Sequence, residues 1–387
     1  MAEGNIGYRL ECIAKLHLID IKSVYGDIMN QITSTPYKYD RSILSRIRKH
    51  LGWDDGDTVL RDIHHIHTSW TLLRLKLWLD ASNASTKIFA LPSRILSLVL
   101  LDPIVFTHLY SSNDPSAHQV QNLLSRVSAL ANVQGIAPRS TIECGSVSSS
   151  CLSTLNTAKS IWPYLDEFPV DGTFFSNDYG HLRSLTEQEK ATLVDRLAAA
   201  LAIISERSVT AYCTVRASVH MLSAVAAPDK PHTRYSLSRR QSIGRVGLIN
   251  AHDARWNAAG LADALVHEAI HSMIYKIELM HPLYEDDEAA HRLTCTSPRT
   301  GNILKLHSFV HACFVWYGLY RFWSSEQTRS ESDRLTLRAQ TGFALPQPFI
   351  NLGDEARHCI KSDVLLEIEK MTVWIQSAHR GRLNNSS

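Results

Sequence analysis

The chain has 387 residues, of which 44% are hydrophobic and 20% are charged, and its formal net charge is +2. This composition is typical of a globular protein with a large core, in one large domain or two ordinary ones. The net charge is too small to indicate binding to nucleic acid or to an acidic membrane surface, so we expect neither a nucleic-acid partner nor a membrane partner. The oligomeric state stays open.

Seven cysteines are scattered along the chain, and none belongs to a C-x-x-C pair. Their odd number and their spacing are typical of reduced thiols and argue against a disulfide framework or a thiolate zinc site. The first residues contain no basic leader followed by an apolar run. We therefore expect a cytoplasmic protein.

Apolar residues at helical spacing recur through the first third of the chain. They predict helices over residues 6–34, 42–51, 68–80, 93–101 and 116–132. The histidine cluster His64, His65 and His67 has no carboxylate or cysteine at a useful spacing, which disfavours metal binding there. We expect residues 1–136 to form a helical N-terminal region.

Residues 137–155 are rich in serine and threonine and poor in large apolar side chains, which predicts a loop. We expect residues 137–387 to form a metal-dependent catalytic region, and one continuous domain would also fit. Thr186 followed by Glu189 forms a capping box and predicts a helix to about residue 205. Four β-rich or extended segments follow. They are residues 208–215, 218–226, 235–240 and 244–250.

The chemistry of the chain centres on residues 267–271, an H-E-x-x-H sequence inside a predicted helix over residues 261–279. Residues four apart lie one turn above each other on a helix, so His267 and His271 can share one metal ion. Apolar residues surround them on nearly all sides of the helix, which predicts a buried helix. A metal would satisfy the two histidines and Glu268 together, because unpaired polar groups are costly inside a protein.

Two histidines are an incomplete metal site, so a third protein ligand is expected. The preferred candidate is His307, with His311 as the alternative, on a predicted apolar helix over residues 302–323. Glu285 and Glu288 are further candidates, although they lie in a charged segment that is more typical of a solvated loop.

Three segments resemble a known family around this motif. They are residues 265–271, the serine-containing residues 235–238 followed by 243–246, and Ser297-Pro298-Arg299 before residues 306–311. Over roughly residues 235–323 the chain resembles the HEXXH-motif peptide-modification proteins, which are α-ketoglutarate-dependent HExxH-type peptide β-hydroxylases. These proteins are found with ribosomally made, post-translationally modified peptides (RiPPs).

The resemblance implies a non-haem Fe(II) oxygenase that uses 2-oxoglutarate and O₂ to hydroxylate an unactivated (β) carbon in a peptide substrate. Imidazole suits Zn(II) as well as Fe(II), so the ligand type leaves the metal open. An arginine would bind the distal carboxylate of 2-oxoglutarate, the small-molecule cosubstrate, because its guanidinium matches a carboxylate with two hydrogen bonds. We favour Arg299 for this role, with Ser297 of the same run and Arg245 as the other candidate cosubstrate-binding residues.

Glu268 separates the competing hypotheses. In a zinc metallopeptidase, the alternative function, Glu268 is the general base that activates the attacking water. In an oxygenase it is a metal ligand or a group that orients one. A third hypothesis is a degenerate zincin that binds a peptide without turnover.

The expected fold is α+β and mostly α, with a zincin-like metal helix packed on a small mixed sheet and a helical N-terminal region. We expect the strand at residues 244–250 to form the edge over which an extended peptide lies.

Overall fold

The computed structural model describes ten stretches of the chain. These are residues 42–53, 58–81, 96, 99–111, 116–132, 164–166, 174–175, 179–297, 302–324 and 352–384. The predicted helix over 6–34, the predicted loop at 137–155 and most of the predicted helix over 93–101 lie outside them. The described residues are mostly helical and contain a small mixed sheet, which confirms the α+β, mostly-α class.

The described residues divide into two compact units, each assembled from separate stretches of chain. The first unit contains described residues of Leu60–Ile204 and Cys213–Lys276. The second contains residues 42–59, Ser205–Tyr212 and the described residues from Ile277 onward. The predicted catalytic region thus contributes to both units, and the proposed two-region division stays a prediction.

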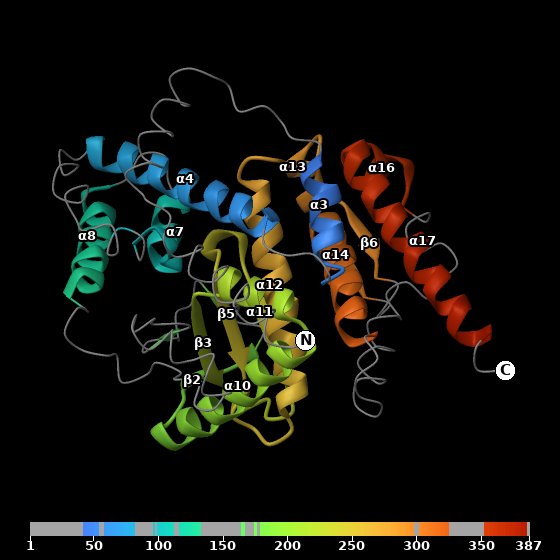
Figure 1. Ribbon diagram of the computed structural model, residues 1–387. Helices are drawn as coiled ribbons and strands as arrows, with labels where there is room; N and C mark the ends of the chain where they lie inside the picture. Colours follow the sequence, from blue (N-terminus) through green and yellow to red (C-terminus); the bar gives the residue numbers. More distant parts are fainter. Residues whose placement is uncertain are drawn as a thin grey trace, which may run out of the picture. The chain divides into compact units, whose positions relative to one another are not determined.

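The first unit is built around a five-stranded sheet (Figure 1). Its strands are β1 (Tyr164–Leu165), β2 (Arg183–Ser184), β3 (Met221–Ala226), β4 (Tyr235–Ser238) and β5 (Arg245–Ile249). The order is β1-β3-β5-β4, and β2 pairs with β3. β3 and β5 are parallel and buried at every position, as expected for strands covered on both faces. A short 3₁₀ helix, η3 (Arg240–Ser242), joins β4 to β5.

The prediction that strand 244–250 forms the sheet edge is wrong. β4 pairs antiparallel with β5, from Tyr235 opposite Ile249 to Ser238 opposite Val246, so β5 lies inside the sheet. Among the described strands, β4 takes the edge position. Strand order is a tertiary property, and the apolar pattern of β5 reports only that it is buried.

The prediction of extended structure at 208–215 is also wrong, because these residues enter helix α11 (Val209–Ser218). Its buried positions include Ala211, Thr214, Val215 and Ser218, which share one face of a helix. The β-branched residues raise strand propensity only weakly, and burial of this face overrides it. The capping box, in contrast, is confirmed at the start of α10 (Glu187–Arg207), where Glu189 accepts from the Thr186 N–H at 2.8 Å.

Three further helices of the first unit enclose an apolar cluster. They are α4 (Thr58–Ala81), α7 (Pro103–Ser111) and α8 (Ala117–Asn132). His64, His65 and His67 lie on α4, and none of them belongs to a group of metal-ligating side chains among the described residues. His67 is buried and packs its ring against Phe106 at a centroid distance of 5.3 Å, so it serves the core.

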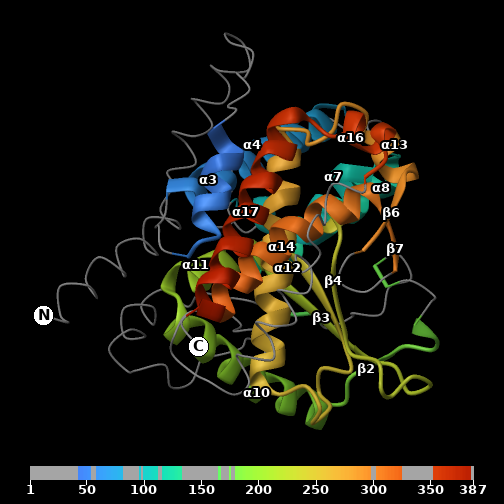
Figure 2. The same cartoon turned by 90° about the vertical axis from the view of Figure 1, so that its right-hand side faces the viewer.

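The second unit is mostly helical (Figure 2). Its main elements are α3 (Ser42–His50), α13 (Asp287–Arg292), α14 (Leu306–Ser324), α16 (Asp354–Cys359), α17 (Ser362–Asn384), β6 (Thr294–Thr296) and β7 (Ile303–Lys305). α14 is buried on nearly all sides, and α17 packs against α14 and α3. The predicted helix over 302–323 begins later, at Leu306, because residues 303–305 pair with β6.

None of the described helices combines enough length with enough apolar character to serve as a membrane span.

The first unit contains a buried lysine whose charge is costly. Lys276 is 0% exposed, its Nζ donates to the Ala217 carbonyl at 2.6 Å, and burial lowers its pKa to about 7. The unfolded chain, with a lysine pKa near 10.4, binds more protons between about pH 7 and pH 10, so stability rises with pH in this window. In protein that has been stripped of metal with a chelator, we expect Lys276→Met to flatten this pH dependence. It should also raise the free energy of unfolding at pH 7 by on the order of 1–3 kcal/mol, a figure that already subtracts the lost hydrogen bond to Ala217.

Urea unfolding at pH 7 and pH 9.5 measures the effect. Lys305→Met is the control, since Lys305 is exposed on β7 and its substitution should leave the pH dependence unchanged. Identical pH slopes for wild type and Lys276→Met would contradict the assignment.

Candidate metal centre

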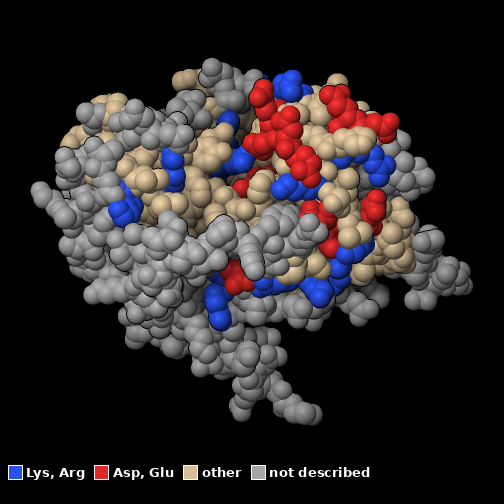
Figure 3. Space-filling view, turned by 90° about the horizontal axis from the view of Figure 1, so that it is seen from above, with Lys and Arg blue, Asp and Glu red and all other residues tan. Residues whose placement is uncertain are grey.

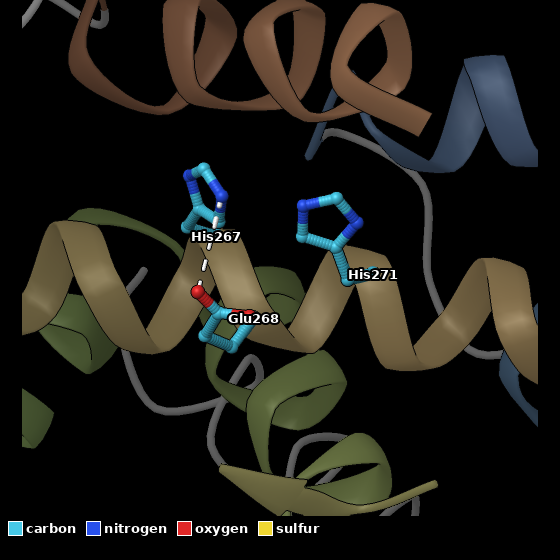
Figure 4. Close-up of side chains that lie close together, drawn as sticks. All are labelled: His267, Glu268 and His271. Carbon is cyan, nitrogen blue, oxygen red and sulfur yellow. Dashed lines mark ion pairs between the residues drawn. The ribbon is translucent and has the colours of Figure 1, made fainter. Parts of the chain in front are cut away.

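The H-E-x-x-H residues lie in the middle of α12 (Ala258–Glu278), as predicted for a helix over 261–279. Their apolar neighbours Leu265, Val266, Ala269 and Ile270 are at most 1% exposed, so the helix is buried as expected. The rings of the two histidines rise from one side of α12 with their centroids 4.9 Å apart (Figure 4). Both residues are partly buried.

The Glu268 carboxylate lies below the two imidazoles in Figure 4, where a dashed line joins it to the ring of His267. Its carboxylate accepts one hydrogen bond at each oxygen: Ser236 Oγ donates to Oε1 and Ser238 Oγ donates to Oε2, each at 2.7 Å. Side chains alternate along a strand, so residues 236 and 238 of β4 face the same way. The edge strand thereby holds the carboxylate by both oxygens, and Oε1 lies 3.9 Å from the Nε2 atom of His267.

Two opposing effects determine the pKa of Glu268, burial and hydrogen bonding. The residue is only 2% exposed, and burial raises its pKa to about 7, against the opposing effect of the two serine hydrogen bonds. Desolvation disfavours the charged form of a carboxyl group, whereas donors to the carboxylate favour it. Glu268 can therefore gain or lose a proton near neutral pH.

The donor set fits a divalent transition metal. His267, Glu268 and His271 each offer a ligand atom, and these atoms all lie within 4.8 Å of one another. Imidazole nitrogen and carboxylate oxygen suit both Zn(II) and Fe(II). His267 and His271, which share one side of the helix, are the residues that would hold the ion.

His307 and His311 lie together in the second unit, where both face Glu278. The Nε2 atoms of His307 and His311 lie 3.3 and 3.2 Å from Glu278 Oε1. Burial alone would raise the pKa of Glu278, but the imidazoles of His311 and His307 outweigh it and hold that pKa well below its usual range. The predicted pairing of His307 with His267 and His271 joins residues of the two units and stays a prediction.

Three residues of these clusters were not assigned a role from sequence: Ser236, Ser238 and Glu278. Glu278 stands seven residues after His271, and two turns of helix return to nearly the same side, so this spacing was the available signal. The serines stand at alternate positions of a strand that precedes the metal helix. Nothing in that pattern names Glu268 as their partner.

Of the predicted cosubstrate-binding residues, Arg245 belongs to the same unit as His267 and His271, and Ser297 belongs to the other unit. Arg245 lies on the sheet face opposite Ser236 and Ser238, where it forms a buried ion pair with Asp166 at 2.8 Å. Ser297 is buried in the second unit and its N–H donates to the Asn302 carbonyl at 2.7 Å, while Arg299 lies outside the described residues. The cosubstrate roles of these residues stay predictions.

Glu285 and Glu288 belong to an exposed acidic segment in the second unit. Residues 285–288 are all exposed, and Figure 3 shows Asp and Glu side chains gathered on the face seen from above. The segment is partly helical, because Asp286 caps α13 by accepting from the Ala289 N–H. Neither glutamate joins a metal-ligating group of the described residues, as expected for a solvated acidic run.

Comparison with known proteins adds no further identification. No protein-family model matches the chain, and no curated protein sequence matches it.

The serine grip on Glu268 predicts an energetic coupling. In protein stripped of metal with a chelator, at pH 8, we expect Ser236→Ala/Ser238→Ala to lower the free energy of unfolding by on the order of 2–4 kcal/mol, because a buried carboxylate loses two hydrogen-bond donors. The same substitutions should cost much less in a Glu268→Ala background, where the carboxylate is gone.

Chemical denaturation of the four proteins measures this coupling. Ser125→Ala, which removes an exposed hydroxyl of α8, is the control and should change stability little. Equal costs of the serine substitutions in the two backgrounds would rule the coupling out.

Proposed function

We propose that this protein is a cytoplasmic Fe(II)- and 2-oxoglutarate-dependent oxygenase that hydroxylates a β carbon in a peptide, in the maturation of a ribosomally made peptide. The observation that carries the proposal is the state of Glu268. Both of its carboxylate oxygens already accept hydrogen bonds from β4, beside two histidines that suit iron. This arrangement fixes the orientation of the carboxylate beside the histidines, as expected for a group that positions a metal ligand.

His267 and His271 would hold the metal, and Glu268, whose ligand atom lies within 4.8 Å of theirs, would be the third protein group of the site, as a positioning residue held by β4. When bound, Fe(II) supplies the means to insert one oxygen atom of O₂ into an unactivated C–H bond while 2-oxoglutarate is oxidised to succinate and CO₂. The partial exposure of both histidines is compatible with a metal that substrate can reach.

The edge strand supports a peptide as substrate. Among the described strands, β4 is paired on one side only, by β5. An extended peptide can add to such an edge through main-chain hydrogen bonds, with alternate side chains reading its sequence. Because the serines of β4 also bind Glu268, a peptide bound along β4 would lie close to the metal helix, in a zincin-like arrangement.

One observation favours the second candidate, a zinc metallopeptidase. The pKa of Glu268, raised to about 7 by burial, is near the value that suits a general base at neutral pH. Each carboxylate oxygen keeps a second lone pair beside its serine hydrogen bond, so in hydrolysis Glu268 would accept its hydrogen bond from water at one of these. The two candidates therefore differ in what Glu268 must do.

Reconstitution separates the two functions. We expect Fe(II)-loaded protein, given 2-oxoglutarate, air and a pool of synthetic peptides, to form succinate and a peptide that has gained one oxygen atom, both detected by mass spectrometry. His118→Ala, which changes an exposed histidine outside both metal-ligating groups, should behave like wild type, and His267→Ala/His271→Ala should be inactive. Cleaved peptide with Zn(II) and no 2-oxoglutarate would instead establish the peptidase.

Substitution of Glu268 gives a second, independent discrimination. If Glu268 orients a metal-binding histidine, Glu268→Gln should weaken Fe(II) binding and succinate formation by about 10- to 100-fold without abolishing them. Iron affinity, measured anaerobically by competition with a chelating dye, reports the positioning role apart from turnover. An unchanged iron affinity together with complete loss of activity would favour a general base.

A further inference from the structure

We propose that Glu278, His307 and His311 form a second metal site, complete within the second unit, for a divalent transition metal such as Zn(II) or Fe(II). This assignment replaces the predicted role of His307 as third ligand of the metal on His267 and His271. It goes beyond the proposed oxygenase function and does not depend on it.

The three ligand atoms lie close together. Glu278 Oε1 lies 3.3 Å from His307 Nε2 and 3.2 Å from His311 Nε2. A tetrahedral ion with bonds of about 2.0–2.1 Å holds neighbouring ligand atoms about 3.3–3.4 Å apart, so these separations are close to those of a filled site. All three ligand atoms lie within 4.8 Å of one another.

The local structure orients both imidazoles. His307 and His311 are four apart on α14, and their rings stack with centroids 4.5 Å apart. The ring of His291, on α13, stacks on His307 at 4.4 Å. The Tyr284 hydroxyl donates to the His307 carbonyl at 3.2 Å. Neighbours that hold metal ligands in place in this way are typical of built sites.

Burial and the donor atoms together indicate which ions this cluster can bind. Glu278, His307 and His311 are 5%, 6% and 1% exposed, so the cluster is withdrawn from water. Two imidazoles and one carboxylate are the ligands of zinc sites and of non-haem iron sites, whereas Ca²⁺ and Mg²⁺ prefer oxygen alone. A metal uses both histidines, whereas an ion pair with the carboxylate requires only one of them.

Metal stoichiometry tests the proposal. The full-length protein is stripped with chelator, titrated with Zn(II), and analysed for bound metal by mass spectrometry. We expect wild type to bind two equivalents, His307→Ala/His311→Ala to bind one, and His267→Ala/His271→Ala to bind one. Glu278→Gln should weaken the second equivalent by more than about 100-fold, because loss of a ligand costs more than loss of an orienting group.

Two further measurements keep the test decisive if a variant of the buried cluster fails to fold. The variant His267→Ala/His271→Ala leaves the second site unaltered. Co(II) added to it should give the visible absorption of a tetrahedral or five-coordinate ion. His118→Ala, which changes an exposed ring of α8 outside both ligand sets, should retain both equivalents.

Two outcomes would overturn the proposal. A single equivalent in wild type that is lost from both double-histidine variants would mean one shared site. No Co(II) spectrum in His267→Ala/His271→Ala, with stoichiometry unchanged by His307→Ala/His311→Ala, would mean a hydrogen-bonded cluster only. If wild type and His267→Ala/His271→Ala instead bind the same single equivalent, the second site stands and the proposed oxygenase site fails.

Discussion

The grip of two serine hydroxyls on one buried carboxylate connects the metal helix to the edge of the sheet. It requires Ser236 and Ser238 to face α12 together, which the two-residue period of a strand allows in one register only. A slip of β4 by one residue would turn Leu237 toward Glu268 and send both hydroxyls to the opposite face. The position of Glu268, and the pKa that burial raises to about 7, therefore depend on the register of a four-residue strand.

The opposite face of the sheet fixes that register. Leu237 lies directly across from Gly247, and a Cβ atom added at Gly247 would meet Leu237 Cδ2 at 2.8 Å and Phe174 Cε1 at 2.9 Å. Only glycine leaves room for these two side chains to close over the strand. Arg245 completes this face, with its guanidinium 4.2 Å from the Phe174 ring centroid and paired with Asp166. Packing on one side of the sheet thus sets hydrogen bonding on the other.

The helices and strands that carry their own apolar periodicity were predicted correctly from the sequence. The expected metal helix at 261–279 agrees with α12 (Ala258–Glu278), and the strands at 235–240 and 244–250 agree with β4 and β5, because each carries its own apolar pattern. Strand order is not local, so the edge was assigned to β5 instead of β4. The grouping of His307 and His311 with Glu278 is likewise a tertiary property, and α11 formed where β-branched residues had indicated a strand.

The part of the chain that the structure describes contains two sets of two histidines and one glutamate, and the two sets differ in burial and therefore in the chemistry they can support. The His267 side chain is 28% exposed, and its glutamate is bound by the edge strand that an extended peptide could join. The imidazoles of the second set are 8% and 1% exposed, so no peptide can reach an ion held there without local opening. An ion that must exchange cosubstrate and product requires the first environment. An ion in the second environment would exchange slowly and stabilise the fold around it, since binding to the native state alone adds to the free energy of unfolding.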